Sequence, residues 1–415
     1  MGISNLRSSM LGWSIFLAVA GGCASESREE QDPIVAAERE LQGLGISVDI
    51  DLRNPGERLD ALRGALLFFT DIPRLEGNRR SCATCHRPED HFALTPETAE
   101  ARYQALLRAR QVNPKADDPL FRAIDADDFA DDFTTLRTKG LVRVKVALPP
   151  NVRLTDDPAA TEVDIFRAVP TIRNTSFGQP YQFDGRIADL EAQALAALQS
   201  HAEIKRQPGD EILGRIARFE RTQFSSFGVR IMDHELSAGN PTPPDPDPPL
   251  TPLEQKGKEL FKDFCAGCHS GPTQTVFREK RLVPPYDGSN LPTFTNVGVS
   301  APEPPGFDLP QNNGLPIRRY TITLPDGSQQ VRETDDPGRI LITGKIEDFD
   351  RFDIPPLYGV AKTAPYFHNN NAATLEDVMI HYQRLFRFFA RGLKHPFPEL
   401  SDADVIPLLA YVRKI

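Results

Sequence analysis

Two copies of one five-residue pattern constrain the fold of this chain more than any other feature of its sequence. They are Cys82-Ala-Thr-Cys85-His86 and Cys265-Ala-Gly-Cys268-His269. In a C-x-x-C-H pattern, two thiols bond to the two vinyl groups of one porphyrin, and the histidine that follows lies beneath the iron as its proximal ligand. The sequence therefore predicts two covalently bound haem c groups, with His86 and His269 as iron ligands.

The N-terminal segment is predicted to direct export. Arg7 precedes an apolar stretch over residues 11–20, which is too short to cross a hydrocarbon core of about 30 Å. Small residues then precede Cys23, in a pattern that resembles the cleavage site of bacterial lipoproteins. We expect a signal peptide over residues 1–22, a tether over residues 23–58, and a periplasmic protein anchored to the outer membrane by a lipid on Cys23. Ordinary cleavage nearby, without a lipid, is the alternative.

Three other roles of the cysteines explain the repeated pattern less well. A zinc site with four cysteines does not require a histidine after each second cysteine. A disulfide within C-x-x-C would stabilise the fold little, and an exported chain has little use for a thioredoxin-like pair alone. Two haem groups therefore remain the preferred interpretation.

Composition narrows the choice of fold and partner. The chain has 48 Lys and Arg against 58 Asp and Glu, so its formal net charge is −10. This balance argues against nucleic acid or an anionic membrane surface as the main partner. Proline contributes 37 of the 415 residues, which favours many loops between short helices, and the hydrophobic fraction of 40% is enough to build cores. We expect a mainly α fold that is rich in loops and proline.

Several stretches of the chain occur twice in the same order. Gly64-Ala-Leu-Leu-Phe68 precedes the first haem motif, and Gly257-Lys-Glu-Leu-Phe261 precedes the second. Residues 169–191 align without gaps with residues 354–376, at an offset of 185 positions. Two tandem c-type cytochrome domains are the simplest interpretation.

Proline marks the boundary between the two domains. Seven prolines among residues 241–252 predict an extended linker. The N-terminal haem domain would then span residues 59–240, and the C-terminal haem domain residues 253–415. The stretch from about residue 96 to 161 has no counterpart in the second half and is rich in aspartate. We expect it to be a solvated acidic insertion, with a cation or partner site as the alternative.

The offset of 185 also predicts that the two irons differ. Tyr382 of the second half corresponds to Ala197 of the first half. A haem iron with a strong second ligand transfers electrons, whereas one without it can bind peroxide or oxygen. We expect Tyr382 to ligate the second iron and the first iron to stay open. Thr374 and Asp377 form the pattern of a capping box at the start of the helix that carries Tyr382.

Polar residues are expected over the open iron. Gln193 corresponds to Val378, and Glu203 corresponds to Phe388. A carboxylate above an open iron can move a proton from the near to the far oxygen of peroxide, so that the O–O bond breaks heterolytically. We predict that Glu203 is the acid and base of peroxide activation and that Gln193 positions the peroxide. The alternative is that both are solvated helix residues.

Stretches from residue 75 onward follow a known family pattern. They are Leu75–Asn78 with the first haem motif, Val169–Asn174, Phe183–Arg186, Leu190–Ala194, the second haem motif, Ile342–Lys345, Thr363–His368 and Ala373–Glu376. Together they resemble the bacterial di-haem cytochrome c peroxidase family, including its MauG-like branch. The resemblance implies a mainly helical fold, a peroxidatic N-terminal haem, an electron-transfer C-terminal haem, often a calcium ion between the domains, and often a homodimer. Glu203 and Gln193 fall on the family's peroxide-activating positions.

The chain departs from the usual pattern of that family. Phe183 stands where the family usually places a tryptophan between the haems, and the only tryptophan, Trp13, lies inside the signal. Electrons would therefore pass Phe183 by direct tunnelling or take another route. Thr363 and Pro365 match positions whose backbone carbonyls bind calcium in the family, but Ala168 replaces the usual asparagine ligand.

The second iron has rival ligands. His381 and Met379 flank Tyr382 on the same expected helix, although neither aligns with its position. Family members that need prior reduction carry methionine there and a histidine that blocks the first haem. This chain has Tyr382 instead, as the MauG-like branch does, and no histidine between His91 and His201 to block the first haem. We therefore expect an enzyme that is active from the di-ferric state.

These inferences predict a function for the chain. We expect reduction of hydrogen peroxide at the first haem, with electrons that reach it through the second haem from a small periplasmic cytochrome c or cupredoxin. A MauG-like oxidase that modifies a protein substrate is one alternative. A di-haem cytochrome that only transfers electrons is another, and a redox or ligand sensor is a third.

Overall fold

The structure, a computed structural model, describes residues 32–275, 294–302, 314–392 and 399–415, apart from the side chains of residues 391 and 392. The predicted signal peptide and the predicted lipid site at Cys23 lie outside these residues. Within them, no helix is both long and apolar enough to cross a membrane. The described part of the chain is mainly helical, as predicted, with short antiparallel strands that the sequence analysis did not predict.

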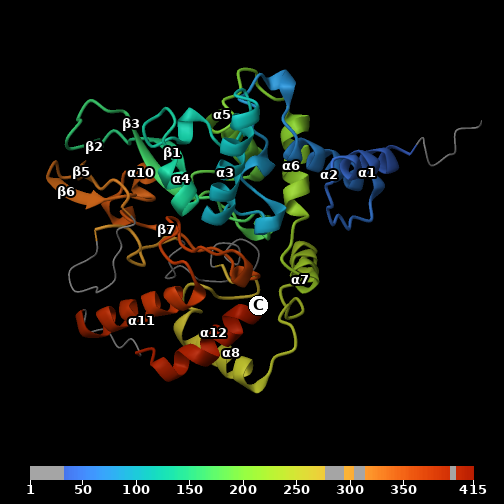
Figure 1. The fold of residues 1–415 in the computed structure, drawn as a ribbon. Coiled ribbons are helices and arrows are strands. Elements are labelled where there is room, and N and C mark those ends of the chain that lie inside the picture. Colours follow the sequence, from blue (N-terminus) through green and yellow to red (C-terminus); the bar gives the residue numbers. More distant parts are fainter. Residues whose placement is uncertain (1–31, 276–293, 303–313, 393–398) are drawn as a thin grey trace, which may run out of the picture.

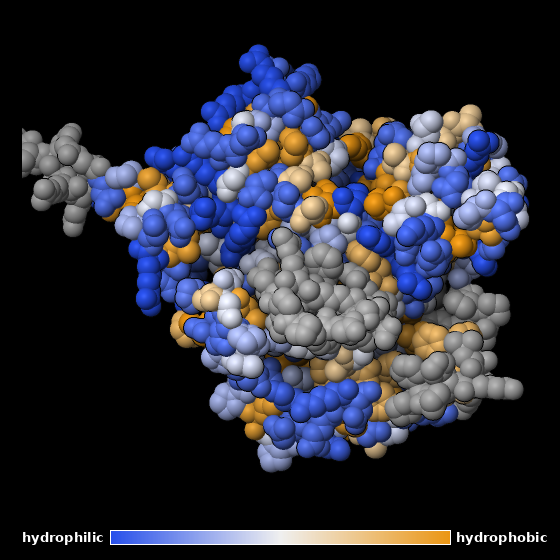
Figure 2. Space-filling view, turned by 180° about the vertical axis from the view of Figure 1, so that it is seen from behind, coloured by the Kyte–Doolittle hydropathy of each residue, from blue (hydrophilic) through white to orange (hydrophobic). Residues whose placement is uncertain are grey.

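Two groups of helices lie apart from each other in Figure 1, with α1, α2, α5 and α6 in one and α8, α11 and α12 in the other. One hydrophobic cluster contains α1, α2, α5 and α6 with Cys82, and another contains α8, α11 and α12 with Cys265. On the face shown in Figure 2, hydrophilic side chains predominate, with smaller apolar areas between them. The helices are α1 (Pro33–Gly43), α2 (Pro55–Phe69), α3 (Pro96–Val112), α4 (Thr134–Lys139), α5 (Leu190–Ser200), α6 (Asp210–Arg221), α7 (Phe227–Ser237), α8 (Pro252–Phe264), α10 (Ile340–Thr343), α11 (Leu375–Gly392) and α12 (Asp402–Lys414).

In the described residues the strands form three small antiparallel sheets, and the second and third join segments that are far apart in the chain. The first pairs β1 with β3, the second has the order β2-β5-β6, and the third pairs β4 with β7. In the second sheet Arg153 lies opposite Thr321, so a strand before residue 241 pairs with one after residue 252. The strands are β1 (Leu141–Ala147), β2 (Val152–Leu154), β3 (Glu162–Ala168), β4 (Phe294–Thr295), β5 (Arg318–Thr323), β6 (Gln329–Thr334) and β7 (Phe352–Asp353).

The stretch from residue 96 to 161 is a packed layer. Its hydrophobic side chains form one cluster with Tyr320 and Ile340 of the second half. Asp125 is fully buried, and a guanidinium nitrogen of Arg80 lies 2.6 Å from its carboxylate oxygen. The prediction of a solvated acidic insertion is therefore wrong for Asp125, because an arginine from outside the insertion compensates the buried charge.

Local signals fix where the helices of the site begin. The Asp377 backbone N–H donates to Thr374 Oγ1 at 3.1 Å, and Asp377 Oδ2 accepts from the Thr374 N–H at 2.9 Å, which confirms the capping box predicted for α11. At the start of α5, Asp189 accepts from the Ala192 N–H at 2.8 Å. These side chains satisfy N–H groups that have no partner inside the helix, so the first turn forms at a defined residue.

Each helix that leads into a haem motif crosses another helix at a glycine. A Cβ atom on Gly64 of α2 would lie 1.9 Å from the Arg215 carbonyl oxygen of α6. A Cβ atom on Gly257 of α8 would lie 1.9 Å from the Pro407 carbonyl oxygen of α12. The two glycines that the sequence places ahead of the two motifs thus occupy the same kind of helix crossing, where only glycine allows the backbones to approach so closely.

We expect Gly64→Ala to destabilise the protein by about 3 kcal/mol, because the added methyl group overlaps the backbone of α6. The measurement is urea unfolding of the purified protein. Gly214→Ala on α6 is the matched control: nothing lies within 4 Å of its Cβ position, so it should stabilise the helix by about 0.5–1 kcal/mol. Equal effects of the two substitutions would contradict the close crossing.

Candidate functional site

The first haem motif forms a short turn that presents two thiols and an imidazole. Cys82–Thr84 is a 3-10 helix, and the Ser81 N–H donates to Thr84 Oγ1 at 3.0 Å. Nδ1 of His86 lies 2.9 Å from the Phe92 carbonyl oxygen. Because a carbonyl only accepts, Nδ1 carries the proton, and Nε2 of the neutral ring carries the lone pair. Burial lowers the pKa of His86 and so favours this neutral form, which is the form that binds a metal.

The second motif repeats this geometry. Nδ1 of His269 lies 3.1 Å from the Gln274 carbonyl oxygen, and burial lowers the pKa of His269 to about 4. The backbone of Pro170 interacts with the His86 ring, and the backbone of Pro355 interacts with the His269 ring. These prolines are equivalent at the offset of 185 positions. The two histidines are therefore held by equivalent backbone groups, and the contacts of Nδ1 with Phe92 and Gln274 make Nε2 the nitrogen that would bind a metal.

The four motif cysteines form no disulfide in the described residues. Burial raises the pKa of the Cys82 thiol and raises that of Cys265 to about 12. Among the residues that the structure describes, no three His, Cys, Asp or Glu side chains are grouped as metal ligands. Each motif thus offers two half-buried thiols beside an imidazole with a free Nε2 lone pair, a donor set that fits haem c.

Glu203 is tied to the loop that precedes the first motif. The Asn78 amide donates to Glu203 Oε2 at 2.8 Å and to the His201 carbonyl oxygen at 2.9 Å. The Asn78 N–H donates to the Ala202 carbonyl oxygen at 2.8 Å. Glu203 itself is exposed and has a positive φ of 51°. Because α5 ends at Ser200, Glu203 is a loop residue, whereas its counterpart in the second half lies within α11.

Gln193 and Ala197 lie one turn apart on α5. Both are half-buried, beside the buried residues Ala194 and Leu198 of the same helix. An i, i+4 spacing puts Gln193 and Ala197 on one helix face. The methyl group of Ala197 cannot ligate a metal, so this position of α5 supplies no iron ligand.

Tyr382 of α11 lies beside the second motif. Burial raises the pKa of its phenol, and the thiols of Cys265 and Cys268 raise it further, which places the phenol within electrostatic reach of both cysteines. The rival His381 is engaged elsewhere, because its Nε2 lies 2.7 Å from the Val297 carbonyl oxygen. Met379 is buried in the hydrophobic cluster of α8, α11 and α12.

Phe183 meets an aromatic pair of the second half. Its ring centroid lies 6.3 Å from that of His368, which stacks on Phe352 at 3.8 Å. The Asp353 N–H donates to the Phe183 carbonyl oxygen at 2.7 Å. Burial lowers the pKa of His368 to about 4, so this ring is neutral. Three aromatic rings are thus in contact across the seam between the two halves.

The buried Arg167 side chain links the two halves at the same seam. Arg167 donates to both carboxylate oxygens of Asp336, at 2.7 and 3.0 Å, and to Asp184 at 2.5 Å. All three side chains are at most 2% exposed. Although burial opposes the charge, the two carboxylates raise the pKa of Arg167, and Arg167 holds that of Asp336 below its usual value. Asp184 and Arg167 belong to the first half and Asp336 to the second, so the network joins them.

The surroundings of Thr363 do not fit calcium. Thr363 lines a pocket together with the cationic side chains of Lys362 and Arg173. Calcium binds six to eight oxygen ligands, and Ala168 offers no side-chain oxygen where an asparagine was expected. The prediction of calcium at Thr363 and Pro365 gains no support from this arrangement, and we assign the ion no role.

His201 was not predicted as part of the site. Its charge influences the pKa of His86, so the two imidazoles lie within electrostatic reach of each other, and burial lowers the pKa of His201. The alignment of the two halves could have indicated this residue. At the offset of 185, His201 corresponds to Phe386, and in the structure Phe386 packs on Tyr382 with ring centroids 5.9 Å apart.

Glu220 of α6 was also missed. It is 4% exposed, its Oε2 has no hydrogen-bond partner, and burial raises its pKa to about 8. When ionised, its carboxylate raises the pKa of the Cys82 thiol, so Glu220 lies within electrostatic reach of the first motif. The sequence of α6 did not predict that Glu220 is buried, because a glutamate next to Arg221 is typical of an exposed helix face.

Glu220 makes stability depend on pH. Its pKa is raised from the ordinary value of 4.5 to about 8, so the folded protein binds more protons than the unfolded chain between these values, and stability falls as pH rises through this range. Asp353, whose pKa burial also raises to about 8, contributes to the same slope. We therefore expect Glu220→Gln to make the slope shallower without abolishing it, and to be more stable than the parent at pH 9 by on the order of 3 kcal/mol. Urea unfolding at pH 5 and pH 9 measures it. The exposed Glu211 of the same helix is the control: Glu211→Gln should keep the slope, and an unchanged slope in Glu220→Gln would contradict the assignment.

Comparison with known proteins finds similar sequences. Residues 61–228 match the family model "Di-haem cytochrome c peroxidase". The chain is 26% identical to cytochrome c551 peroxidase of Pseudomonas aeruginosa over 234 residues, which cover 51% of this chain and 56% of that protein. It is 28% identical to the methylamine utilization protein MauG of Paracoccus denitrificans over 363 residues, which cover 80% of this chain and 76% of that protein. The match to the first of these relatives thus spans about half of its length.

A solved structure of a MauG-like protein associated with microbial copper homeostasis is also similar. It has a TM-score of 0.46 and 21% identity, and the match covers 89% of this chain and 90% of that one. Because residues 61–228 match the family model, this stretch belongs to the di-haem cytochrome c peroxidase family, and the resemblance predicted from the sequence is confirmed.

Proposed function

We propose that this protein is a di-haem c oxidoreductase that reduces hydrogen peroxide at the first haem, with electrons passed through the second. An open haem iron supplies peroxide binding and electron transfer. The observation that carries the proposal is the unlike pair of helices: α11 brings Tyr382 to Cys265 and Cys268, whereas α5 has Ala197 at the corresponding position. The haem-binding residues in this proposal are Cys82, Cys85 and His86 for the first haem, and Cys265, Cys268, His269 and Tyr382 for the second.

The residues over the first haem have separate roles in this proposal. Glu203 accepts a proton from one peroxide oxygen and returns it to the other. Asn78 holds the carboxylate through its 2.8 Å hydrogen bond, and Gln193 orients peroxide from α5. The rings of Phe183, His368 and Phe352, in contact across the seam, would offer a tunnelling path between two bound haems at the position where the family usually has a tryptophan.

The domain organisation follows the same proposal. Residues 59–240 and 253–415 carry one haem each, joined by the linker 241–252. The support is the repeated crossing of a glycine-containing helix ahead of each motif. We also propose export to the periplasm, a lipid anchor on Cys23, a small cytochrome or cupredoxin as electron donor, and a homodimer.

Two other functions are favoured by particular observations. The match to MauG spans 80% of this chain, which favours a peroxide-dependent oxidase that modifies a protein substrate. Electron transfer without catalysis would require a ligand for the first iron, and His201 is the imidazole nearest to that role. Whether the first iron has a second ligand distinguishes electron transfer without catalysis from the other two functions.

The deciding measurement is low-temperature EPR of the di-ferric holoprotein before and after one equivalent of hydrogen peroxide. A high-spin signal from one haem and a low-spin signal from the other, both lost with peroxide, are expected. Two low-spin haems that are indifferent to peroxide would refute the open first iron and point to His201. Electron donors are then compared by the rate at which each is oxidised in the presence of peroxide.

Tyr382→Phe tests the ligand of the second iron. Because the variant keeps the ring and removes the oxygen, we expect the low-spin signal to become high-spin while the first haem is unchanged. His381→Gln is the matched control on the same helix and should keep the low-spin signal. The reverse result, loss of that signal only in His381→Gln, would transfer the ligand role to His381.

A further inference from the structure

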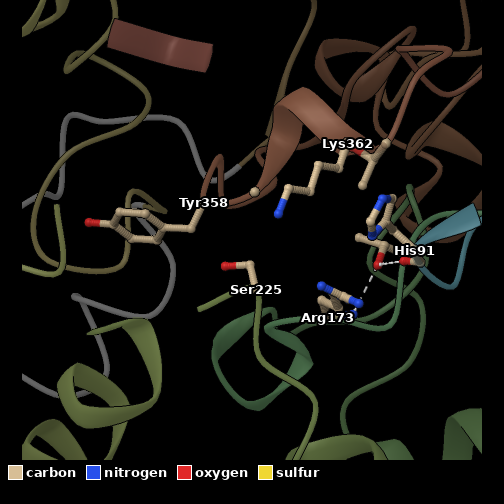
Figure 3. A pocket seen from close by; sticks show the side chains of 8 residues that line it. His91, Arg173, Ser225, Tyr358 and Lys362 are labelled. Carbon is tan, nitrogen blue, oxygen red and sulfur yellow. Dashed lines mark hydrogen bonds between the residues drawn. The ribbon is translucent and has the colours of Figure 1, made fainter. Parts of the chain in front are cut away.

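A small pocket lies between the two halves of the chain. Its empty volume, together with the open solvent at its mouth, is about 230 Å³. It is lined by Thr171, Arg173 and Ser225 of the first half, Tyr358, Lys362 and Thr363 of the second half, and also His91 and Gly359. Figure 3 shows the Lys362 amine directed into the space above Ser225 and Arg173, with the His91 ring on the same side as Arg173. No role proposed above uses these side chains.

The walls of the pocket are held by specific contacts. The buried Asn174 amide donates to Ser225 Oγ at 3.1 Å and to the Tyr358 carbonyl oxygen at 3.0 Å, so one side chain links both halves. A Cβ atom on Gly359 would lie 2.6 Å from Ser225 Cβ, which shows how closely the two backbones approach. Thr171 Oγ1 donates to the His91 carbonyl oxygen at 2.6 Å. The pocket is therefore a fixed feature of the seam.

Its charge is positive. Burial lowers the pKa of His91, and the charges of Arg173 and Lys362 lower it further, so both cations act on the same ring. The buried Nδ1 atom of His91 has no hydrogen-bond partner. The carboxylate whose charge acts on this ring is that of Asp90, and it already accepts a hydrogen bond from the Thr98 hydroxyl at 2.9 Å. None of the residues that line the pocket is acidic, so its cations lack a negative partner there.

The pocket lies close to both haem motifs. Thr171 and Arg173 follow Pro170, whose backbone contacts His86, and Tyr358 and Gly359 follow Pro355, whose backbone contacts His269. A negative charge held there would act on both proximal histidines. It would also offset the repulsion between the cations that the two halves bring to the seam.

We propose that this pocket is an anion site between the two haem-binding halves, in which Lys362, Arg173 and the His91 Nδ1 atom bind an oxyanion of the carboxylate or phosphate type. The anion is either a free one or a propionate of a bound haem. Binding of a free anion does not depend on the proposed function. Binding of a propionate rests on the proposed function, because it requires the two haems. The site also explains the poor fit of calcium at Thr363, because the seam already carries its positive charge on side chains.

Phosphate titration tests the binding of a free anion. Inorganic phosphate is titrated into the di-ferric holoprotein by calorimetry at constant ionic strength. Lys362→Gln and Arg173→Gln should each weaken binding by about 10-fold or more, because each removes a charged hydrogen-bond donor. Lys256→Gln, an exposed lysine of α8, is the matched control and should bind as the parent does. Binding that is equal in all four proteins would place phosphate elsewhere and overturn the proposal.

Reduction potentials test the binding of a propionate. If a propionate fills the pocket, phosphate does not bind, and Lys362→Gln lowers the potential of at least one haem, since loss of a positive charge favours the ferric state. Lys256→Gln should leave both potentials unchanged. Absence of phosphate binding together with unchanged potentials in Lys362→Gln and Arg173→Gln would overturn the proposal. Neither readout uses peroxide turnover, so these outcomes are independent of whether the proposed reaction is correct.

Discussion

Glu203→Gln is expected to lower kcat/KM for hydrogen peroxide by about 10²–10⁴-fold, the range that a positioned acid and base contributes. The substitution is nearly isosteric. Its amide oxygen can still accept from the Asn78 amide, which lies 2.8 Å from the carboxylate, so the side chain keeps its place and loses only the ability to take up a proton. The measurement is steady-state peroxide reduction with a reduced small cytochrome as electron donor.

The matched control is Glu235→Gln. Glu235 Oε2 also accepts from an asparagine amide, that of Asn240 at 3.1 Å, but it lies on α7 and has no part in the proposed site. Its substitution should leave turnover unchanged. Haem content and the high-spin EPR signal should be the same in both variants. Full turnover in Glu203→Gln would remove the acid and base role from this residue.

The sequence determines the helix starts of the site because their signals are local. The capping pair of Thr374 and Asp377 is three residues apart, and it forms as predicted. The glycines at positions 64 and 257 precede equivalent motifs, and each allows a helix crossing. A pattern within a few residues limits the backbone directly, so it can be interpreted without knowledge of the rest of the fold.

Other features depend on partners that are distant in the chain. The pairing of β2 with β5 joins Arg153 to Thr321, and the burial of Asp125 depends on Arg80, which lies 45 positions earlier. The local sequence around β2 or around Asp125 does not indicate which distant residue each will contact. The offset of 185 placed Glu203 opposite a helical residue, yet α5 ends at Ser200. An alignment of two halves therefore transfers residue order but not the length of a helix.

Arg167→Met is expected to lower the free energy of unfolding by about 3–5 kcal/mol, the cost of leaving a buried charge without its partner. Arg167 is the one side chain in this network that binds both Asp336 and Asp184, and all three are almost fully buried. Methionine would fill much of the volume but leave the Asp336 carboxylate without its guanidinium partner, and Asp184 with Arg186 alone at 2.6 Å. Urea unfolding at pH 7 measures the change.

The control for this substitution is Arg413→Met. Arg413 also pairs with a carboxylate, that of Glu376, but the two side chains are 50% and 48% exposed. Water screens such a pair, so its loss should cost less than about 1 kcal/mol. At low pH, protonation of Asp336 should reduce the difference between Arg167→Met and the parent, since its uncompensated charge disappears. A cost as small as that of Arg413→Met would mean that water enters the seam and that Arg167 does not hold the two halves together.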